Sequence, residues 1–292
     1  MKQKKFLAQA GMVITTMIWG ITFVMVKDAL NDAGPYMFAF LRFGLAFLVG
    51  TIFAYNKIES ITINEVIAGL ICGFTLFAGY AFQNYGLMET TPSKSAFITS
   101  VSVIMVPIIL FLFRINQVKM KVWLSTFLAI VGLYILLDPT GVGLNVGDIL
   151  TFGCALSFAI HVIFQDRYLS KGVDVVNFFL TQMIFITIFS FIGAILFEGN
   201  SFYLTDRLLI AIIITGILAT FVSFLLMIWA QTMLDANQTA ILLSLEPVFA
   251  ALFSTFFAGE ILGFYGWVGG FVIVVAVISS NITIYHPKKN KD

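Results

Sequence analysis

The chain has 292 residues, of which 60% are hydrophobic, 15% aromatic and only 11% charged, and its formal net charge is +1. Soluble globular proteins carry about 25% charged residues, so this composition and a mean hydropathy of +1.01 exclude a soluble domain and indicate an integral membrane protein. The basic residues are dispersed in short connections and form no patch of the kind that binds nucleic acid.

Ten apolar segments follow one another along the chain, each judged against the roughly 20 residues that a helix needs to cross a bilayer. The connections between them are short and polar, so none can hold a separate domain. We therefore predict an all-α integral membrane protein with ten transmembrane helices. The segments are about 6–26, 35–55, 66–88, 93–113, 121–137, 146–165, 175–197, 208–234, 236–259 and 261–285.

The first apolar segment follows Lys2, Lys4 and Lys5, as the apolar part of a signal peptide follows its basic start. It is about a full span long, however, and no Ala-x-Ala-like cleavage site ends it. We expect it to be retained as the first helix.

The loop cations predict the orientation of the helices in the membrane. The end of the bundle richer in lysine and arginine is expected to face the cytoplasm. The other end has only Lys27, Lys94 and Arg207, while Arg42 lies within a segment. Both termini are therefore predicted to be cytoplasmic, in the plasma membrane. The richer end has Lys2, Lys4, Lys5, Lys57, Arg114, Lys119, Lys121, Arg167, Lys171, Lys288, Lys289 and Lys291.

The two halves of the chain repeat the same order of features. Trp123 precedes Gly132 by the same interval that separates Trp267 from Ala276. Each half has five segments, and because five is odd, the second copy must enter the membrane upside down. Inverted repeats around a site near the midplane are typical of secondary transporters. We predict two five-helix repeats that form one membrane domain, residues 1–140 and 141–292.

Several short motifs resemble the drug/metabolite transporter superfamily, in particular its ten-span EamA-type branch. The resemblance covers nearly the whole chain through the order and spacing of these motifs. It implies a ten-helix inverted-repeat transporter that moves small organic solutes, often amino acids or related metabolites, and frequently outward. The motifs are Trp19-Gly20 with Lys27, Leu41-Arg42-Phe43, Ser244-Leu245-Glu246-Pro247 and Ala258-Gly259-Glu260.

Glu246 is the single charge within the apolar run that begins at Ala236 and ends before Glu260. A continuous helix would place it roughly 16 Å beyond Asp235, near the middle of the bilayer. A carboxylate at that depth is tolerated mainly beside a partner or a water-filled cavity. We expect it to bind a cationic group of the solute or to exchange a proton. The alternative is a structural carboxyl that joins two neighbouring helices.

Arg42 lies about 10 Å below the outer surface in the second segment. It is expected to attract a carboxylate or phosphate, unless it snorkels to the interface or pairs with Asp28 or Asp32. Together with Glu246 it would suit a zwitterion such as an amino acid. Gln182 occupies the same position in the seventh segment as Arg42 in the second, so the inverted repeat predicts equivalent places for them.

Other candidates are polar or aromatic residues within the apolar segments. His161 is deep in the sixth segment, where it either relays a proton with Glu246 or bonds a neighbouring helix. An amide and aromatic lining for the solute is predicted, although aromatic residues near helix ends also form interfacial belts. The predicted lining residues are Trp19, Tyr80, Gln83, Asn84 and Trp229.

Pro107 and Pro247 interrupt two apolar segments. Each removes a backbone donor and frees a carbonyl one turn earlier, at Val103 and Leu243. The two prolines are therefore candidate hinges, or otherwise simple packing kinks.

No cofactor, metal or catalytic site is predicted. The chain has no P-loop and no H-E-x-x-H motif, and Cys72 and Cys154 lie in apolar segments as expected of buried thiols. We expect a secondary transporter, in the direction of export, with a small-molecule solute and membrane lipid as partners, as a monomer or homodimer. Proton coupling is left open. The alternative is a non-transporting membrane receptor or assembly protein, with a closed, dry bundle that satisfies Glu246 by protein partners alone.

Overall fold

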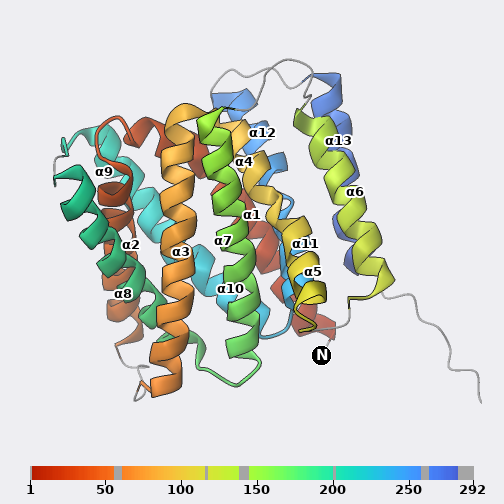
Figure 1. The fold of residues 1–292 in the computed structure, drawn as a ribbon, viewed down its shortest axis with the longest axis horizontal. Coiled ribbons are helices and arrows are strands. Elements are labelled where there is room, and N and C mark those ends of the chain that lie inside the picture. Colours follow the sequence, from red (N-terminus) through yellow and green to blue (C-terminus); the bar gives the residue numbers. More distant parts are fainter. Residues whose placement is uncertain are drawn as a thin grey trace, which may run out of the picture.

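The computed structural model describes residues 2–55, 61–115, 118–137, 145–199, 202–257 and 263–281. In this part of the chain the elements are helices, together with one isolated β-bridge between Ala33 and Phe202. The helices pack side by side as a bundle (Figure 1). Their bounds are α1 (Lys2–Ala29), α2 (Pro35–Ala54), α3 (Ile63–Glu89), α4 (Pro92–Ser100), α5 (Ser102–Leu112), α6 (Met120–Leu137), α7 (Val146–Leu169), α8 (Val175–Gly193), η1 (Ala194–Glu198), α9 (Asp206–Ile213), η2 (Ile214–Val222), α10 (Ser223–Gln231), α11 (Ala236–Leu243), α12 (Glu246–Phe257) and α13 (Phe264–Asn281).

Eight helical stretches in the described residues are long and apolar enough to cross a membrane. They agree with eight of the predicted segments. The fifth and tenth predicted segments are also helical, but their apolar parts, Met120–Ile135 and Phe264–Ala276, are shorter. The eight stretches are Gln3–Ala29, Pro35–Ala54, Ile63–Glu89, Pro92–Leu112, Val146–Leu169, Val175–Glu198, Asp206–Gln231 and Ala236–Phe257.

Polar residues at the segment boundaries start the helices. Thr62 and Glu65 form a reciprocal capping box at the start of α3, and Asn145 and Asp148 do the same for α7. Such side chains satisfy backbone N–H groups that have no partner inside the helix. Four further helices have a single capping side chain at their start: Thr91 for α4, Asp174 for α8, Thr205 for α9 and Asp235 for α11.

Two predicted spans are not single helices. The span at 93–113 is interrupted at Val101, between α4 and α5, and the span at 236–259 is interrupted at Ser244 and Leu245, between α11 and α12. Pro247 stands in the first turn of α12, where a missing N–H costs no intrahelical bond. Pro107 is inside α5, six residues after the break at Val101.

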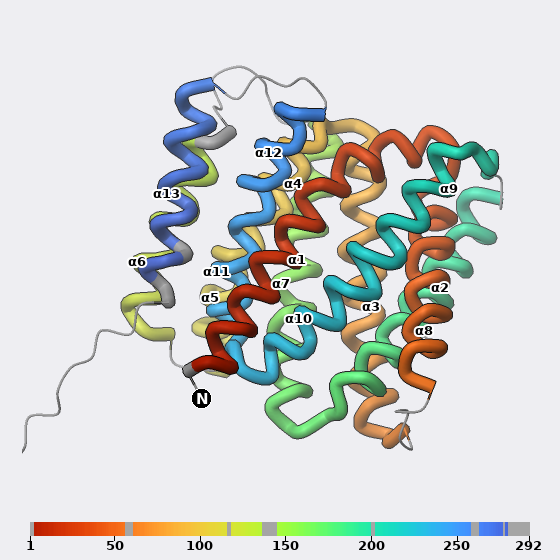
Figure 2. Tube along the Cα trace, turned by 180° about the vertical axis from the view of Figure 1, so that it is seen from behind, coloured from red at the N-terminus to blue at the C-terminus, as the bar shows by residue number. Residues whose placement is uncertain are grey.

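The two broken helices run beside each other in opposite directions. The first piece of one packs on the second piece of the other, because α4 contacts α12 and α5 contacts α11. Figures 1 and 2 show α4 and α12 in one half of the bundle and α5 and α11 in the other half. The two breaks therefore lie at a similar level along the bundle axis.

Glycines allow the helix backbones to approach closely. A Cβ atom at Gly20 of α1 would lie 2.7 Å from the Cβ of Phe249 in α12, and one at Gly73 of α3 would lie 2.8 Å from a side chain of α8. Gly69, one turn before Gly73, also faces α8. The Gly69-x-x-x-Gly73 pair thus serves packing within the molecule.

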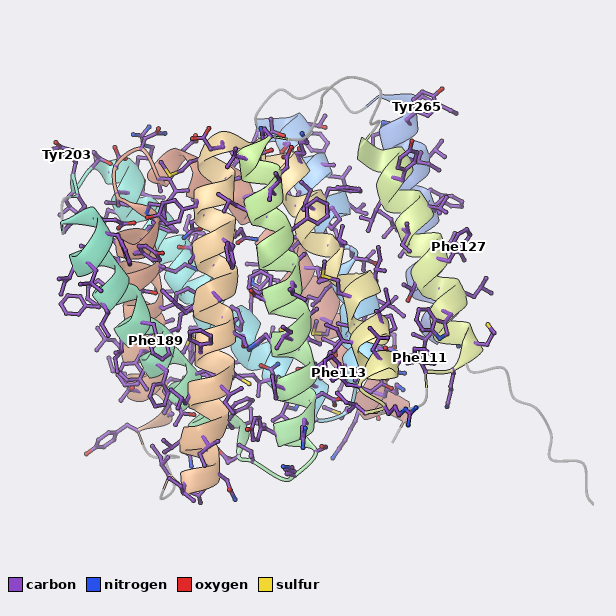
Figure 3. The ribbon with its side chains drawn as sticks, in the orientation of Figure 1. Phe111, Phe113, Phe127, Phe189, Tyr203 and Tyr265 are labelled. Atoms are coloured by element: carbon purple, nitrogen blue, oxygen red, sulfur yellow. The ribbon has the colours of Figure 1, made fainter. Side chains whose placement is uncertain are left out.

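Large apolar side chains cover the outside of the bundle, as expected of a protein surrounded by lipid. Phe111, Phe127, Tyr203 and Tyr265 are all more than half exposed, and Figure 3 shows Phe127, Tyr203 and Tyr265 at the edges of the bundle. Helices α6 and α13 pack on each other along one edge (Figure 2). Water would not support so large an exposed apolar surface.

Candidate functional site

A narrow cavity of about 50 Å³ lies inside the bundle, where the breaks of both interrupted helices meet α1, α2, α3, α7 and α10. A water molecule needs about 10–15 Å³ of such space, so the cavity has room for a few waters but not for a metabolite in this conformation. Its polar and indole lining consists of Trp19, Thr22, Arg42, Tyr80, Gln83, Thr99, Ser100, Ser102, His161 and Glu246.

Arg42 of α2 is the buried cation of this cavity, with 3% of its surface exposed. Its Nε donates to Thr220 Oγ1 at 2.7 Å, and a terminal nitrogen donates to the Tyr80 hydroxyl at 3.3 Å. The guanidinium carbon lies 4.7 Å from the centre of the Tyr80 ring, within the range of a cation–π interaction. The groups that contact the guanidinium directly are therefore neutral.

The prediction that Arg42 snorkels to the interface or pairs with Asp28 or Asp32 is wrong. The side chain is buried, and Asp32 instead accepts two hydrogen bonds from Arg207. The sequence distance from Arg42 to the helix start put the interface within reach of its side chain. The aromatic ring of Tyr80 and the hydroxyl of Thr220 draw the guanidinium toward the bundle interior.

The π-helix η2 provides the platform for Arg42 and Trp19. Thr220 Oγ1 donates to the carbonyl of Thr215, five residues earlier, at 2.8 Å, which leaves its lone pairs directed at Arg42. Trp19 Nε1 donates to the carbonyl of Ala219 at 2.7 Å. A π-helix leaves such groups available, and π-bulges are frequent at functional sites.

Glu246 occupies the first position of α12, beside the break, and is 7% exposed. In the described part of the chain, its carboxylate has no hydrogen bond or salt bridge to another residue. The N-terminal end of a helix favours negative charge, so the break itself helps to accommodate the carboxylate. Arg42 and Glu246 line the same cavity without forming an ion pair.

His161 of α7 lines the cavity with one side and bonds α3 with the other. Its Nδ1 lies 3.2 Å from the carbonyl of Cys72 and 3.3 Å from Thr75 Oγ1, while Nε2 has no partner in the described residues. The Cys72 carbonyl can only accept, so a proton on Nδ1 would satisfy its contact with the ring. The predicted contact with a neighbouring helix is confirmed.

Three other predicted lining residues also reach the cavity: Trp19, Tyr80 and Gln83. Gln83 Nε2 donates to Thr99 Oγ1 at 3.3 Å, which joins α3 to α4. The Trp19 ring lies against Phe224 at 5.2 Å between centroids. These contacts fix an amide and two aromatic rings around the cavity.

Asn84, Gln182 and Trp229 do not line the cavity. Asn84 donates to the carbonyl of Pro35 at the start of α2, and Trp229 packs near Gly11 of α1. Gln182 is fully buried in α8, and its amide has no partner in the described residues. The predicted equivalence of Gln182 with Arg42 therefore does not extend to the cavity.

The sequence analysis missed the hydroxyl groups of the first broken helix and the partner of Arg42. Thr99, Ser100 and Ser102 surround the break at Val101 and line the cavity. Three hydroxyl residues in four positions of an apolar span could have been recognised in the sequence. No sequence pattern singles out Thr220, because only the π-helical turn directs its side chain toward α2.

The end of the bundle predicted to lie outside contains well-paired ions. Lys94 pairs with Asp148 at 2.6 Å, and Lys27 donates to the carbonyl of Leu87 at the end of α3. The hydrogen bonds from Arg207, and then that from Thr205, hold the pKa of the loop residue Asp32 below its usual value. The cavity reaches toward this end, since Leu87 is among its lining residues.

The remaining predicted features divide between described and undescribed residues. Cys72 and Cys154 are free and buried, as predicted. In the described part of the chain, no group of His, Cys, Asp or Glu has the arrangement of a metal site. The predicted motif at Ala258–Glu260 and the loop cations Lys57 and 288–291 lie outside the described residues.

Comparisons with known proteins indicate the family to which the chain belongs. The chain is 33% identical to an uncharacterized transporter of Archaeoglobus fulgidus over 96% of this chain and 88% of the relative. It is 27% identical to an S-adenosylmethionine uptake transporter of Rickettsia bellii, over 91% and 89% of the two chains. It is 25% identical to a probable amino-acid metabolite efflux pump of Escherichia coli, over 65% and 64%. The EamA-like transporter family matches residues 7–138 and again 145–282. The chain therefore belongs to the EamA-like transporter family, a family of transporters rather than enzymes.

Proposed function

We propose that this protein is a secondary transporter of small zwitterionic metabolites of the amino-acid type, and that it works by alternating access between two inverted five-helix repeats. The observation that carries the proposal is the pair Arg42 and Glu246. They line one buried cavity from different helices, and no salt bridge joins them. Buried charges that no opposite charge contacts directly are costly, so their retention is expected where a ligand supplies the opposite charges.

A zwitterion would complete both charges at once. Its carboxylate would meet Arg42, whose fork geometry suits carboxylates, and its ammonium would meet Glu246. Hydroxyl groups of Ser100 and Ser102 and the amide of Gln83 offer further hydrogen bonds between the two ends. The aromatic rings of Trp19 and Tyr80 would cover the apolar part of the solute.

The broken helices support alternating access. In many transporters the solute site is formed by discontinuous helices at corresponding positions of two inverted repeats. Here the breaks of α4/α5 and α11/α12 fall in the fourth segment of each half, and both breaks contribute to the cavity. We propose residues 1–140 and 141–292 as the repeats.

The helix contacts also support inverted repeats. If each helix of the first half is exchanged for its counterpart in the second, the contact of α1 with α10 becomes that of α7 with α3, and both occur. Likewise, the contact of α1 with α12 becomes that of α7 with α5, and the contact of α1 with α11 becomes that of α7 with α4; all four occur. The pairs α2 with α8 and α6 with α13 map onto themselves. The family's two matches, at 7–138 and 145–282, are consistent with the same division.

The named relatives support the substrate class but differ in direction. S-adenosylmethionine carries an α-amino and an α-carboxyl group, and an amino-acid metabolite is the named substrate of the efflux relative. For the present chain we propose export across the plasma membrane. We also propose that both termini are cytoplasmic, because the loop cations favour that orientation.

The test uses purified protein in proteoliposomes and three related solutes that carry different charged groups. A neutral amino acid is compared with its decarboxylated amine and its N-acetylated acid in counterflow. The wild type is expected to prefer the zwitterion. Arg42→Ala should abolish the preference for the zwitterion over the amine, and Glu246→Gln should abolish the preference over the acid.

Two outcomes would reject this substrate class. If Arg42→Ala and Glu246→Gln both transport the zwitterion at the wild-type rate, the two charges do not bind it. If the wild type moves none of the three solutes in exchange while remaining folded, a zwitterionic substrate is excluded. Uptake driven by an imposed pH gradient tests proton coupling, and uptake that ignores the gradient indicates facilitated exchange.

The structure does not favour the alternative of a non-transporting receptor or assembly protein. That alternative predicts a dry bundle in which protein groups satisfy Glu246. A polar cavity is present instead, and among the described residues no side chain pairs with this carboxylate.

A further inference from the structure

We propose that Gln165 of α7 and Gln231 of α10 form the inner gate of the transport pathway, so that solute passes between these two helices when the bundle opens at this end. The inference rests on the proposed transport function. It starts from a second pocket, which lies beyond the floor of the central cavity and includes Asp166, Ser170 and Asp235 in its lining.

Only one helical turn separates the two spaces. Val162 of α7 and Met227 of α10 line the central cavity. Four residues further along the same helices, Asp166 and Gln231 line the second pocket, whose volume is about 200 Å³. Four residues of helix correspond to about 6 Å, so the barrier is thin.

The glutamine pair fills this turn. Gln165 Nε2 donates to Gln231 Oε1, and Gln231 Nε2 donates to the carbonyl of Val162 at 3.3 Å. Gln165 is fully buried and Gln231 is 4% exposed. The two amides therefore bridge α7 and α10 between the cavity and the second pocket.

Neutral amides suit a contact that must open repeatedly. Hydrogen bonds between polar side chains of membrane helices are individually weak, and water can replace both partners when the helices separate. The opposite end of the bundle is different, because Lys94 and Asp148 join α4 to α7 there by an ion pair. Among the described residues, no salt bridge joins α7 to α10, so opening at the glutamine pair breaks no such ion pair there.

The gate also connects to the broken helix. Asp166, next to Gln165, accepts a hydrogen bond from the backbone N–H of Ala236 at 3.2 Å, at the start of α11. The same interrupted span carries Glu246 at its break. Separation of α7 from α10 would thus pull on the element that holds the central carboxylate.

The test measures access to the cavity rather than transport. In a chain with Cys72→Ala and Cys154→Ala, a reporter Ser102→Cys is placed in the cavity lining. Its reaction with a membrane-impermeant thiol reagent is followed separately from each side of sealed vesicles. Ser170→Cys, in the exposed turn after α7, identifies the side on which the second pocket opens.

Gln165→Ala and Gln231→Ala are each expected to raise the reporter's labelling rate from that side by roughly threefold to tenfold. The labelling rate of the double variant should be close to that of each single variant, since the two substitutions remove the same contact. Gln182→Ala is the matched control, because it truncates an equally buried glutamine away from both pockets and should leave the rate unchanged.

Labelling rates within twofold of the parent for both alanine variants would overturn the gate. If an alanine variant does not fold, Gln165→Met and Gln231→Met, which keep the side-chain volume, decide the question by the same criterion. A raised rate in a protein that transports none of the three solutes would keep the gate and reject the substrate class. Unchanged labelling rates in a protein that transports the zwitterion would reject the gate and keep the substrate class.

Discussion

Asp32 and Glu246 are equally hidden carboxylates in very different surroundings. Asp32 is 9% exposed and Glu246 is 7% exposed. Asp32 accepts hydrogen bonds from Thr205 at 2.7 Å and from two nitrogens of Arg207 at 2.8 and 2.7 Å. Glu246 has no such partner among the described residues.

The difference indicates what each carboxylate does. The contacts of Asp32 join the connection before α2 to the start of α9, and they are complete within the protein. In the described part of the chain Glu246 has no such contacts, and it lines a cavity that Arg42 also lines. We therefore expect Asp32 to act on stability and Glu246 to act on transport, and variants of each can test the distinction.

The largest expected effect is that of Glu246→Gln on transport. The substitution keeps the volume but removes a charge that would bind the solute's ammonium group. A hydrogen bond to a charged group contributes about 1.5–3 kcal/mol, which corresponds to a roughly 10- to 100-fold loss of transport efficiency. Initial counterflow rates over a range of zwitterion concentrations measure this loss.

The matched control is Asp32→Asn, which makes the same chemical change in the paired carboxylate. It should leave transport efficiency within about twofold of wild type. The distinction between the two carboxylates fails if Asp32→Asn reduces transport as much as Glu246→Gln does.

Arg42→Lys is expected to have an intermediate effect. Lysine keeps the charge but has no planar fork, so it cannot reach both Thr220 and Tyr80 and present a guanidinium edge to the solute. We expect a roughly tenfold loss of transport efficiency, mainly through a higher KM. Arg207→Lys, in a half-exposed ion pair at the rim, should transport normally. Equal losses in both variants would indicate that Arg42 acts only through packing.

The smallest expected effect is the pH-dependent loss of stability in Asp32→Asn. The folded state lowers the pKa of Asp32 from 3.8 through its hydrogen bonds with Arg207 and Thr205. A carboxylate with a depressed folded pKa stabilises the protein above its unfolded pKa, and this contribution disappears as the pH falls through the folded value. Wild type should therefore melt slightly above Asp32→Asn at pH 7, and the difference should start to shrink near about pH 4 and disappear only below the lowered folded pKa.

Thermal unfolding in detergent at both pH values measures this contribution. High salt should reduce the difference at pH 7, because the Arg207 side chain is 51% exposed and its pair is screened. A difference that persists unchanged at low pH would mean that the asparagine disturbs packing rather than the ion pair.

Much of the candidate site was readable as individual residues. Glu246, Arg42 and His161 are polar groups inside apolar segments, and all three line the cavity. Asn84 and Gln182 gave the same signal but lie elsewhere. In a lipid-facing helix both faces are apolar, so the sequence pattern does not reveal which side of the helix points inward.

The sequence by itself determined the number and order of the apolar segments, because membrane thickness sets a minimum length and lipid excludes unpaired backbone. It also determined that a charge such as Glu246 needed a polar environment. Only the tertiary structure decided that the helices break at Val101 and at Ser244 and Leu245. It also decided that Arg42 and Glu246, far apart in the chain, meet at one cavity. Rotation and crossing of apolar helices depend on close packing among many residues, which no single segment specifies.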